Sequence, residues 1–171
     1  AIGACAGGHE WLKALHLLRN MPSLRLRADS ISYNSSISGC GNSFSWQVGV
    51  ALLSEMWAYK VLPNTSTFNS TISLHANISQ WASALYNLVL MWRADVAPDK
   101  ISFNTSLTAC EHASEWWQAL TLLDQMENMT IELDSVSCSA AVVSCARVAM
   151  QTCHHAWRLL KQLEKHGLSL T

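Results

Sequence analysis

Hydrophobic and polar positions recur along this chain with a period of 35 residues. Trp recurs at four successive positions of one column, and Leu, Met and Asn recur in others at the same spacing. The Trp column comprises Trp11, Trp46, Trp81 and Trp116. Self-similarity at a fixed period of this length is typical of proteins in which one supersecondary unit is copied along the chain. The sequence therefore predicts a stack of similar units.

Three complete units and two incomplete ones cover the sequence as a single repeat array from residue 1 to residue 171. The complete units are residues 30–64, 65–99 and 100–134. A partial unit, residues 1–29, precedes them. The last unit, residues 135–171, is degenerate and contains a two-residue insertion.

Each unit has the pattern of two amphipathic helices. In its first half, apolar residues lie at helical spacing, as at Phe103, Leu107 and Cys110. A short polar segment follows, and the second half, from Trp116 to Met126, has apolar residues three or four apart. One helical hairpin cannot bury its apolar face, but stacked hairpins can. We therefore predict an all-α fold, an α-solenoid of stacked antiparallel helix-turn-helix hairpins.

Three further columns support this interpretation. Small residues line the second helix where it meets the first: Ala14, Gly49, Ala84, Ala119 and Ala156. Another column contains Cys5, Cys40, Cys110 and Cys145, with His75 in its gap. We interpret these cysteines as small buried residues of the first helix, and the Trp column as packing between hairpins. A last column, Trp57 and Trp92, is expected to be partly exposed and is a candidate protein-contact surface.

A four-residue motif opens each complete unit. The three copies are Ile31-Ser32-Tyr33-Asn34, Ser66-Thr67-Phe68-Asn69 and Ile101-Ser102-Phe103-Asn104. With Ala-Leu and Leu-Leu in the second helix and Pro-Asn or Pro-Asp at the junction, the sequence resembles the pentatricopeptide repeat (PPR) family, in its P-type form with 35-residue repeats. This resemblance covers almost the whole chain. It implies a right-handed superhelix and binding of single-stranded RNA, one base per repeat.

The resemblance also implies which residues contact RNA. A polar residue early in the first helix pairs with the residue that closes the same unit, and the two read a base edge. These pairs are Asn34 with Asn64, Asn69 with Asp99, Asn104 with Asp134, and Ser139 with Thr171. The residues that pack on the base face are Ile31, Ser66, Ile101 and Val136. By the family pattern, Asn with Asp favours U and Asn with Asn favours a pyrimidine, so the expected target is 5′-(C/U)-U-U-N-3′.

These residue types suit the task on chemical grounds as well. An amide offers donors and an acceptor to the edge of a pyrimidine, and a carboxylate accepts from a base N–H. A branched aliphatic side chain gives a flat apolar contact that tolerates any base. The resemblance further implies a role in organellar RNA processing, stability, editing or translation, in a chloroplast or mitochondrion, although we find no targeting segment in the sequence.

Charge keeps a second hypothesis open. Lys and Arg number 11, Asp and Glu number 12, and the formal net charge is −1. Proteins that hold nucleic acid by attraction to phosphates are usually basic. The alternative is therefore a helical-repeat scaffold for protein–protein interaction, whose partners could be other proteins of an RNA-processing assembly.

Other classes of function find little support in the sequence. Carboxylates are scattered, and neither a Ser-His-Asp arrangement nor a phosphate-binding glycine loop is present, so we expect no enzymatic activity from these residues. A catalytic domain elsewhere in a longer protein remains compatible with this. No CxxC pair occurs, and we expect no metal site and no cofactor. Apolar runs are too short to predict a membrane span.

Overall fold

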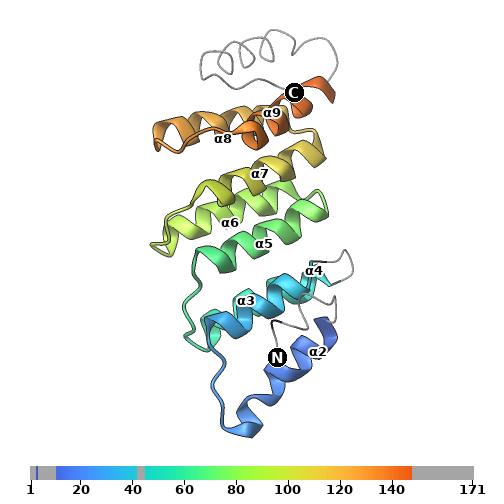
Figure 1. Ribbon diagram of the computed structural model, residues 1–171, viewed down its shortest axis with the longest axis vertical. Helices are drawn as coiled ribbons and strands as arrows, with labels where there is room; N and C mark the ends of the chain where they lie inside the picture. The colour runs from blue at the N-terminus through green and yellow to red at the C-terminus, as the bar shows by residue number, and fades with distance from the viewer. Residues whose placement is uncertain (1–2, 4–10, 42–44, 148–171) are drawn as a thin grey trace.

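The computed structural model describes residues 3, 11–41 and 45–147. Within these residues the chain forms α-helices, one short 3-10 helix and no strand. The helices are α2 (Trp11–Asn20), η1 (Pro22–Leu24), α3 (Ser30–Gly39), α4 (Trp46–Ala58), α5 (Thr65–Asn77), α6 (Trp81–Arg93), α7 (Lys100–Ala113), α8 (Trp116–Asn128) and α9 (Ser135–Arg147). Figure 1 shows them stacked one above another, from α2 at one end to α8 and α9 at the other. The predicted all-α solenoid is confirmed.

The first helix of each unit begins directly after a residue that caps it. Asn64 and Asp99 have extended backbones, and each side chain accepts a hydrogen bond from the backbone N–H three residues later, at 3.0 Å from Thr67 and 2.8 Å from Ser102. Such a side-chain acceptor satisfies one of the N–H groups that a helix start leaves without a partner. The helices α5 and α7 therefore begin at equivalent positions 35 residues apart. The boundaries of the units themselves stay a prediction.

The second helix of each unit ends in a left-handed residue that is not glycine. Lys60, Asp95 and Thr130 have φ of 57°, 55° and 56°. In each case the following N–H donates to a methionine carbonyl at 2.9 Å, as Val96 does to Met91. This is the Schellman arrangement, in which glycine is the usual left-handed residue. Because no glycine occupies these positions, the sequence did not predict the left-handed turns.

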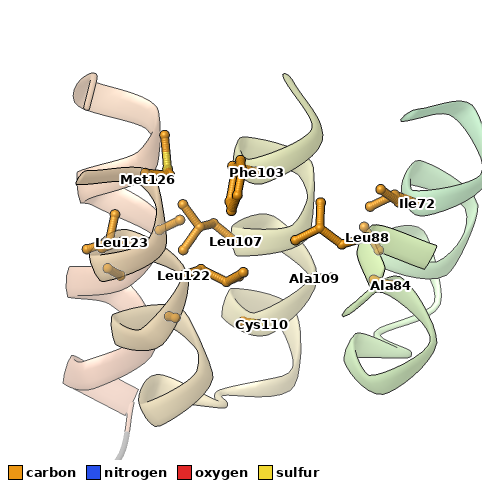
Figure 2. Packing of buried hydrophobic residues seen from close by; sticks show 14 of the residues in the cluster. Ile72, Ala84, Leu88, Phe103, Leu107, Ala109, Cys110, Leu122, Leu123 and Met126 are labelled. Atoms are coloured by element: carbon orange, nitrogen blue, oxygen red, sulfur yellow. The ribbon is translucent and has the colours of Figure 1, made fainter. Parts of the chain in front are cut away.

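The largest apolar core of the described residues extends from Leu53 of α4 to Ala140 and Ala141 of α9. Phe103 and Leu107 of α7 are almost completely buried, and Figure 2 shows their side chains between those of α6 and α8. Trp81 packs against this cluster, while Trp11 and Trp46 pack against a second cluster nearer the N-terminus. The expectation that the Trp column packs between hairpins is thus confirmed for these three residues.

The cysteine column also behaves as expected where the structure describes it. Cys40 and Cys110 are buried free thiols of the first helices, 1% and 0% exposed. The side chains of Cys5 and Cys145 lie outside the described residues. No helix within the described ranges has the length and apolar character needed to cross a bilayer.

Candidate nucleic-acid interface

The structure brings together the members of three predicted pairs, although each pair is 30 residues apart in sequence. Their side chains are directly hydrogen-bonded: Asn34 Nδ2 donates to Asn64 Oδ1 at 3.1 Å, Asn69 Nδ2 to Asp99 Oδ1 at 3.1 Å, and Asn104 Nδ2 to Asp134 Oδ2 at 3.1 Å and Oδ1 at 3.3 Å. The same contact therefore recurs at the start of α5, α7 and α9. Its role in binding RNA stays a prediction at this point.

The contact recurs because the closing residue of each unit has two structural tasks. Asp99 caps α7 through Oδ1, which accepts the Ser102 N–H. The same oxygen accepts from Asn69, which lies on α5. A side chain held at a helix end and bonded to the neighbouring helix has little rotational freedom. The position of each pair is thus set by the ends of two packed helices.

A buried hydroxyl lies beneath each of the first two pairs, and sequence reasoning missed it. Thr67 and Ser102 are fully buried. Each hydroxyl donates to the amide oxygen of the paired asparagine, Asn34 or Asn69, at 2.6 Å. Ser and Thr recur in this position of the opening motif, so the repeat period was an available signal.

Asp29 is a second residue that sequence reasoning missed. It occupies the same column as Asn64 and Asp99, and its Oδ1 accepts from the N–H of Ser32 at 2.9 Å and from the Ser32 hydroxyl at 2.7 Å. Its side chain therefore caps α3 as the other closing residues cap their helices.

The bonds within the first two pairs leave different polar atoms open. All hydrogen bonds to the Asn64 side chain from the described residues end on Oδ1, so its Nδ2 is an open donor. All those to the Asp99 side chain likewise end on Oδ1, so Oδ2 is an open acceptor. In both pairs the asparagine Nδ2 uses one of its two hydrogens. The first pair thus presents donors, and the second presents one donor beside one acceptor.

Both paired aspartates are held in the ionised form. Burial alone would raise the pKa of Asp99, but hydrogen bonds from Ser102 and Asn69 outweigh it and keep the pKa below its ordinary value of 3.8. Burial acts the same way on Asp134, and there the Ser137 N–H and Lys100 lower the pKa. Both carboxylates are therefore ionised at neutral pH.

Aliphatic side chains stand exposed three positions before each pair's first residue. Ile31, Ile101 and Val136 are 71%, 61% and 51% exposed, and Ser66, the fourth predicted packing residue, is exposed as well. These three aliphatic residues contribute little to the core, since folding leaves most of their surface in water. They are apolar surface beside the polar pairs.

The fourth predicted pair is only half described. The Ser139 hydroxyl donates to the Val136 carbonyl at 3.0 Å, and Thr171 lies outside the described residues. In the described part of the chain, no group of three or more His, Cys, Asp or Glu side chains is arranged to hold a metal ion.

Comparison by sequence finds no matching family model, and no curated protein matches either. Comparison by structure does find matches. The PPR domain of Arabidopsis thaliana protein-only RNase P 1, crystallised with tRNA, is 16% identical with a TM-score of 0.84, and the match covers 99% of this chain and 89% of that one.

Two longer proteins match as well. PPR10, a maize protein, in complex with an 18-nt psaJ RNA element is 19% identical with a TM-score of 0.80, over 99% of this chain and 25% of that one. The nuclear proteinaceous RNase P 2 of A. thaliana is 16% identical with a TM-score of 0.80, over 95% of this chain and 36% of that one. This chain therefore spans about a quarter to a third of the length of these two.

The stacked hairpins and the recurring side-chain pairs define a helical-repeat solenoid. Its particular form is the pentatricopeptide repeat fold, which the structural neighbours share over nearly the whole chain. The resemblance seen in the sequence is confirmed by this fold.

Proposed function

We propose that this chain binds single-stranded RNA with base selectivity, one base per repeat. The observation that carries the proposal is the recurrence of one hydrogen-bonded polar pair in three successive units. In each unit an exposed packing position lies three residues before the asparagine of the pair. Two structural neighbours were crystallised with RNA, which supports the same use of the fold here.

The second pair suits uracil. The free N–H of Asn69 can donate to a uracil carbonyl, and the open Oδ2 of Asp99 can accept the uracil N3–H. Cytosine has a lone pair at N3, which would face the ionised carboxylate. A hydrogen bond to a charged group contributes about 1.5–3 kcal/mol, so this contact can discriminate between the two pyrimidines.

The first pair suits either pyrimidine. Its closing residue is an amide whose oxygen is already engaged, and the open atom, Asn64 Nδ2, is a donor. Cytosine offers N3 and O2 as acceptors, and uracil offers its two carbonyl oxygens. With the third pair reading U by the family pattern, the proposed target is 5′-(C/U)-U-U-N-3′, with the last base left open at Ser139 and Thr171.

The base faces pack against the exposed aliphatic side chains of Ile31, Ile101 and Val136 in this proposal. Ser66 offers less apolar surface, so the second repeat should hold its base less firmly. In the cell we propose a role in organellar RNA processing, stability, editing or translation, in a chloroplast or mitochondrion, with no enzymatic activity in the array itself.

The test is a base-preference measurement on Asn69→Ser. Short single-stranded RNAs carrying 5′-CUUA-3′, with each of the four bases at the second position, are titrated against wild type and variant. We expect wild type to prefer U there and the variant to shift towards G, because the shorter hydroxyl side chain leaves room for a purine. Asn128→Ser, at the exposed end of α8, is the matched control and should keep the preference for U.

An unchanged preference in Asn69→Ser contradicts the assignment of this pair. Specific binding should also weaken as salt rises, since phosphate contacts release counterions. A wild-type chain that binds none of these RNAs at low salt contradicts the proposed function altogether.

A protein-interaction scaffold is the second candidate, and one observation favours it. Tyr86, Val89 and Trp92 follow one another at three-residue spacing on α6 and are 56%, 47% and 50% exposed, with Trp57 of α4 46% exposed. Contiguous exposed apolar surface often marks protein contacts. The expected exposure of Trp57 and Trp92 is thus confirmed, and a scaffold without RNA binding would give no response in the titrations above.

A further inference from the structure

The second and third repeats carry the same Asn–Asp pair but open on different residues. Thr65 opens residues 65–99, and Lys100 opens residues 100–134. Lys100 Nζ lies 3.2 Å from Asp134 Oδ2, the carboxylate that closes its own unit. In the second repeat, the described residues place no cation on Asp99. The two pairs are therefore chemically distinct despite their identical residues.

The lysine completes the set of partners around Asp134. Oδ1 accepts from the Ser137 N–H at 2.9 Å and from Asn104 at 3.3 Å, while Oδ2 accepts from Asn104 at 3.1 Å and from Lys100. A carboxylate has about four acceptor positions, two on each oxygen. Asn104 Nδ2 bridges the two oxygens, and Lys100 takes the remaining position on Oδ2, whereas Oδ2 of Asp99 is open. A base N–H that reached Asp134 would have to displace one of these donors.

The buried hydroxyl of the third pair is also redirected. Ser137 donates to the backbone carbonyl of Asp134 at 2.9 Å, whereas Ser102 donates to the amide oxygen of Asn69. As a result Asn104 Oδ1 is buried with no partner among the described residues, and its Nδ2 contacts both carboxylate oxygens. The amide is thus bound to the carboxylate more fully than in the second pair.

Given the proposed function, we propose that Lys100 is a specificity-determining residue of the third repeat. It occupies the acceptor that would take the uracil N3–H and presents ammonium N–H donors in its place. Those donors suit N3 of cytosine and the carbonyl oxygens of either pyrimidine. The third repeat therefore accepts cytosine and uracil alike, while the second selects uracil. This changes the third base of the proposed target from U, which the family pattern gives, to either pyrimidine.

The size of the effect follows from the exposure of the ion pair. The Lys100 and Asp134 side chains are 42% and 29% exposed, so water and salt screen their attraction. One hydrogen bond gained or lost at such a site changes an affinity by about three- to tenfold. We expect the ratio of U to C affinity to differ between the two repeats by this factor.

A reciprocal exchange tests the proposal. Lys100→Thr gives the third repeat the opening residue of the second, and Thr65→Lys does the reverse. The affinities of wild type and both variants are measured for RNAs with U or C at the second or third position. Lys100→Thr should raise the U-to-C ratio at the third position by about three- to tenfold and leave the second unchanged. Thr65→Lys should lower the ratio at the second position only.

The salt dependence of the U-to-C affinity ratio is a second measurement, and a change in helix stability alone would not alter it. Raising the ionic strength screens the ion pair, so the wild-type U-to-C ratio at the third position should rise towards that of Lys100→Thr. If Lys100→Thr leaves the third ratio unchanged while the second position still selects uracil, the role of Lys100 is overturned and the proposed function stands. If wild type binds no RNA, both are overturned.

Discussion

Two junctions between repeats share their surface pairs but differ in their cores. At the junction of residues 30–64 with 65–99, the core contains Leu74 and His75 of α5, and Gly49 of α4 faces Leu74. The equivalent residues at the next junction are Ala109, Cys110 and Ala84. At the first junction the large side chain of Leu74 therefore fills the space that the missing side chain of Gly49 leaves. At the next junction both equivalent residues, Ala84 and Ala109, have a small side chain.

The surface pairs keep the same geometry at both junctions, although the closing residue is Asn64 at the first and Asp99 at the second. Asn34 to Asn64 and Asn69 to Asp99 are both 3.1 Å, and the buried hydroxyls beneath them both donate at 2.6 Å. The pairs are held by helix caps, which depend on local backbone geometry rather than on the volume of the core. The comparison teaches that the interface and the core of this array can vary independently.

The largest expected effect comes from breaking the Leu74 arrangement. Leu74 is 2% exposed, and Leu74→Ala should lower the free energy of unfolding by about 2–5 kcal/mol, since it leaves a cavity. Gly49→Ala alone should also destabilise, because a methyl group there overlaps with Leu74 Cδ1 and lies 3.3 Å from Cys40 Cβ. The double variant recreates the alanine pair of the next junction and should be more stable than the sum of the two changes predicts, by about 1–2 kcal/mol. Urea denaturation of the four proteins measures this coupling.

A matched cycle provides the control. Leu123 is buried in α8, which makes no contact with α4. Leu123→Ala combined with Gly49→Ala should therefore be additive within about 0.5 kcal/mol. Additivity in the Leu74 cycle as well would show that the two residues do not compensate for each other.

The next effect concerns pH, because the first junction has a histidine, His75, where the second has Cys110, a buried thiol that stays neutral at and below neutral pH. His75 is 4% exposed, its ring centroid lies 6.0 Å from that of Trp46, and its Nδ1 has no partner within the described residues. Burial lowers the pKa of His75 below its ordinary value of 6.5. The unfolded chain therefore binds this proton more readily, and stability present above pH about 6.5 is lost as the pH falls towards the folded-state pKa.

His75→Cys, which restores the residue type of Cys40 and Cys110, should flatten this dependence. One proton taken up on unfolding contributes at most about 1.4 kcal/mol per pH unit. Urea denaturation of wild type and variant between pH 8 and pH 5 gives the slopes, and the other histidines are common to both proteins. Equal slopes for wild type and His75→Cys would place the origin of acid sensitivity elsewhere.

The sequence predicted the helices and the pairs, but only part of their chemistry. The columns of Trp, Leu and Met predicted the stack of helical hairpins, because the same apolar positions recur at a spacing of 35 residues. Two residues that are 30 positions apart in sequence meet in each pair because the closing residue caps the next helix, which packs beside the helix of its partner. The capture of Asp134 by Lys100 was not predictable, since the repeat pattern treats the second and third pairs as identical. The left-handed turns were missed because Lys60, Asp95 and Thr130 occupy them in place of the usual glycine.

The smallest effect tests what the two junctions have in common. Lys60 and Asp95 end the second helices before each junction with φ of 57° and 55°, and both are exposed. A left-handed conformation costs a residue with a Cβ about 1–2 kcal/mol, and the greater freedom of glycine in the unfolded chain offsets part of the gain on replacement. Lys60→Gly and Asp95→Gly should each raise the free energy of unfolding by about 0.5–1 kcal/mol, by equal amounts in urea denaturation. Ser54→Gly, at an exposed position within α4, should lower it by about 0.5 kcal/mol. Equal gains would confine the difference between the junctions to Gly49, Leu74 and His75, whereas unequal gains would extend it to the turns.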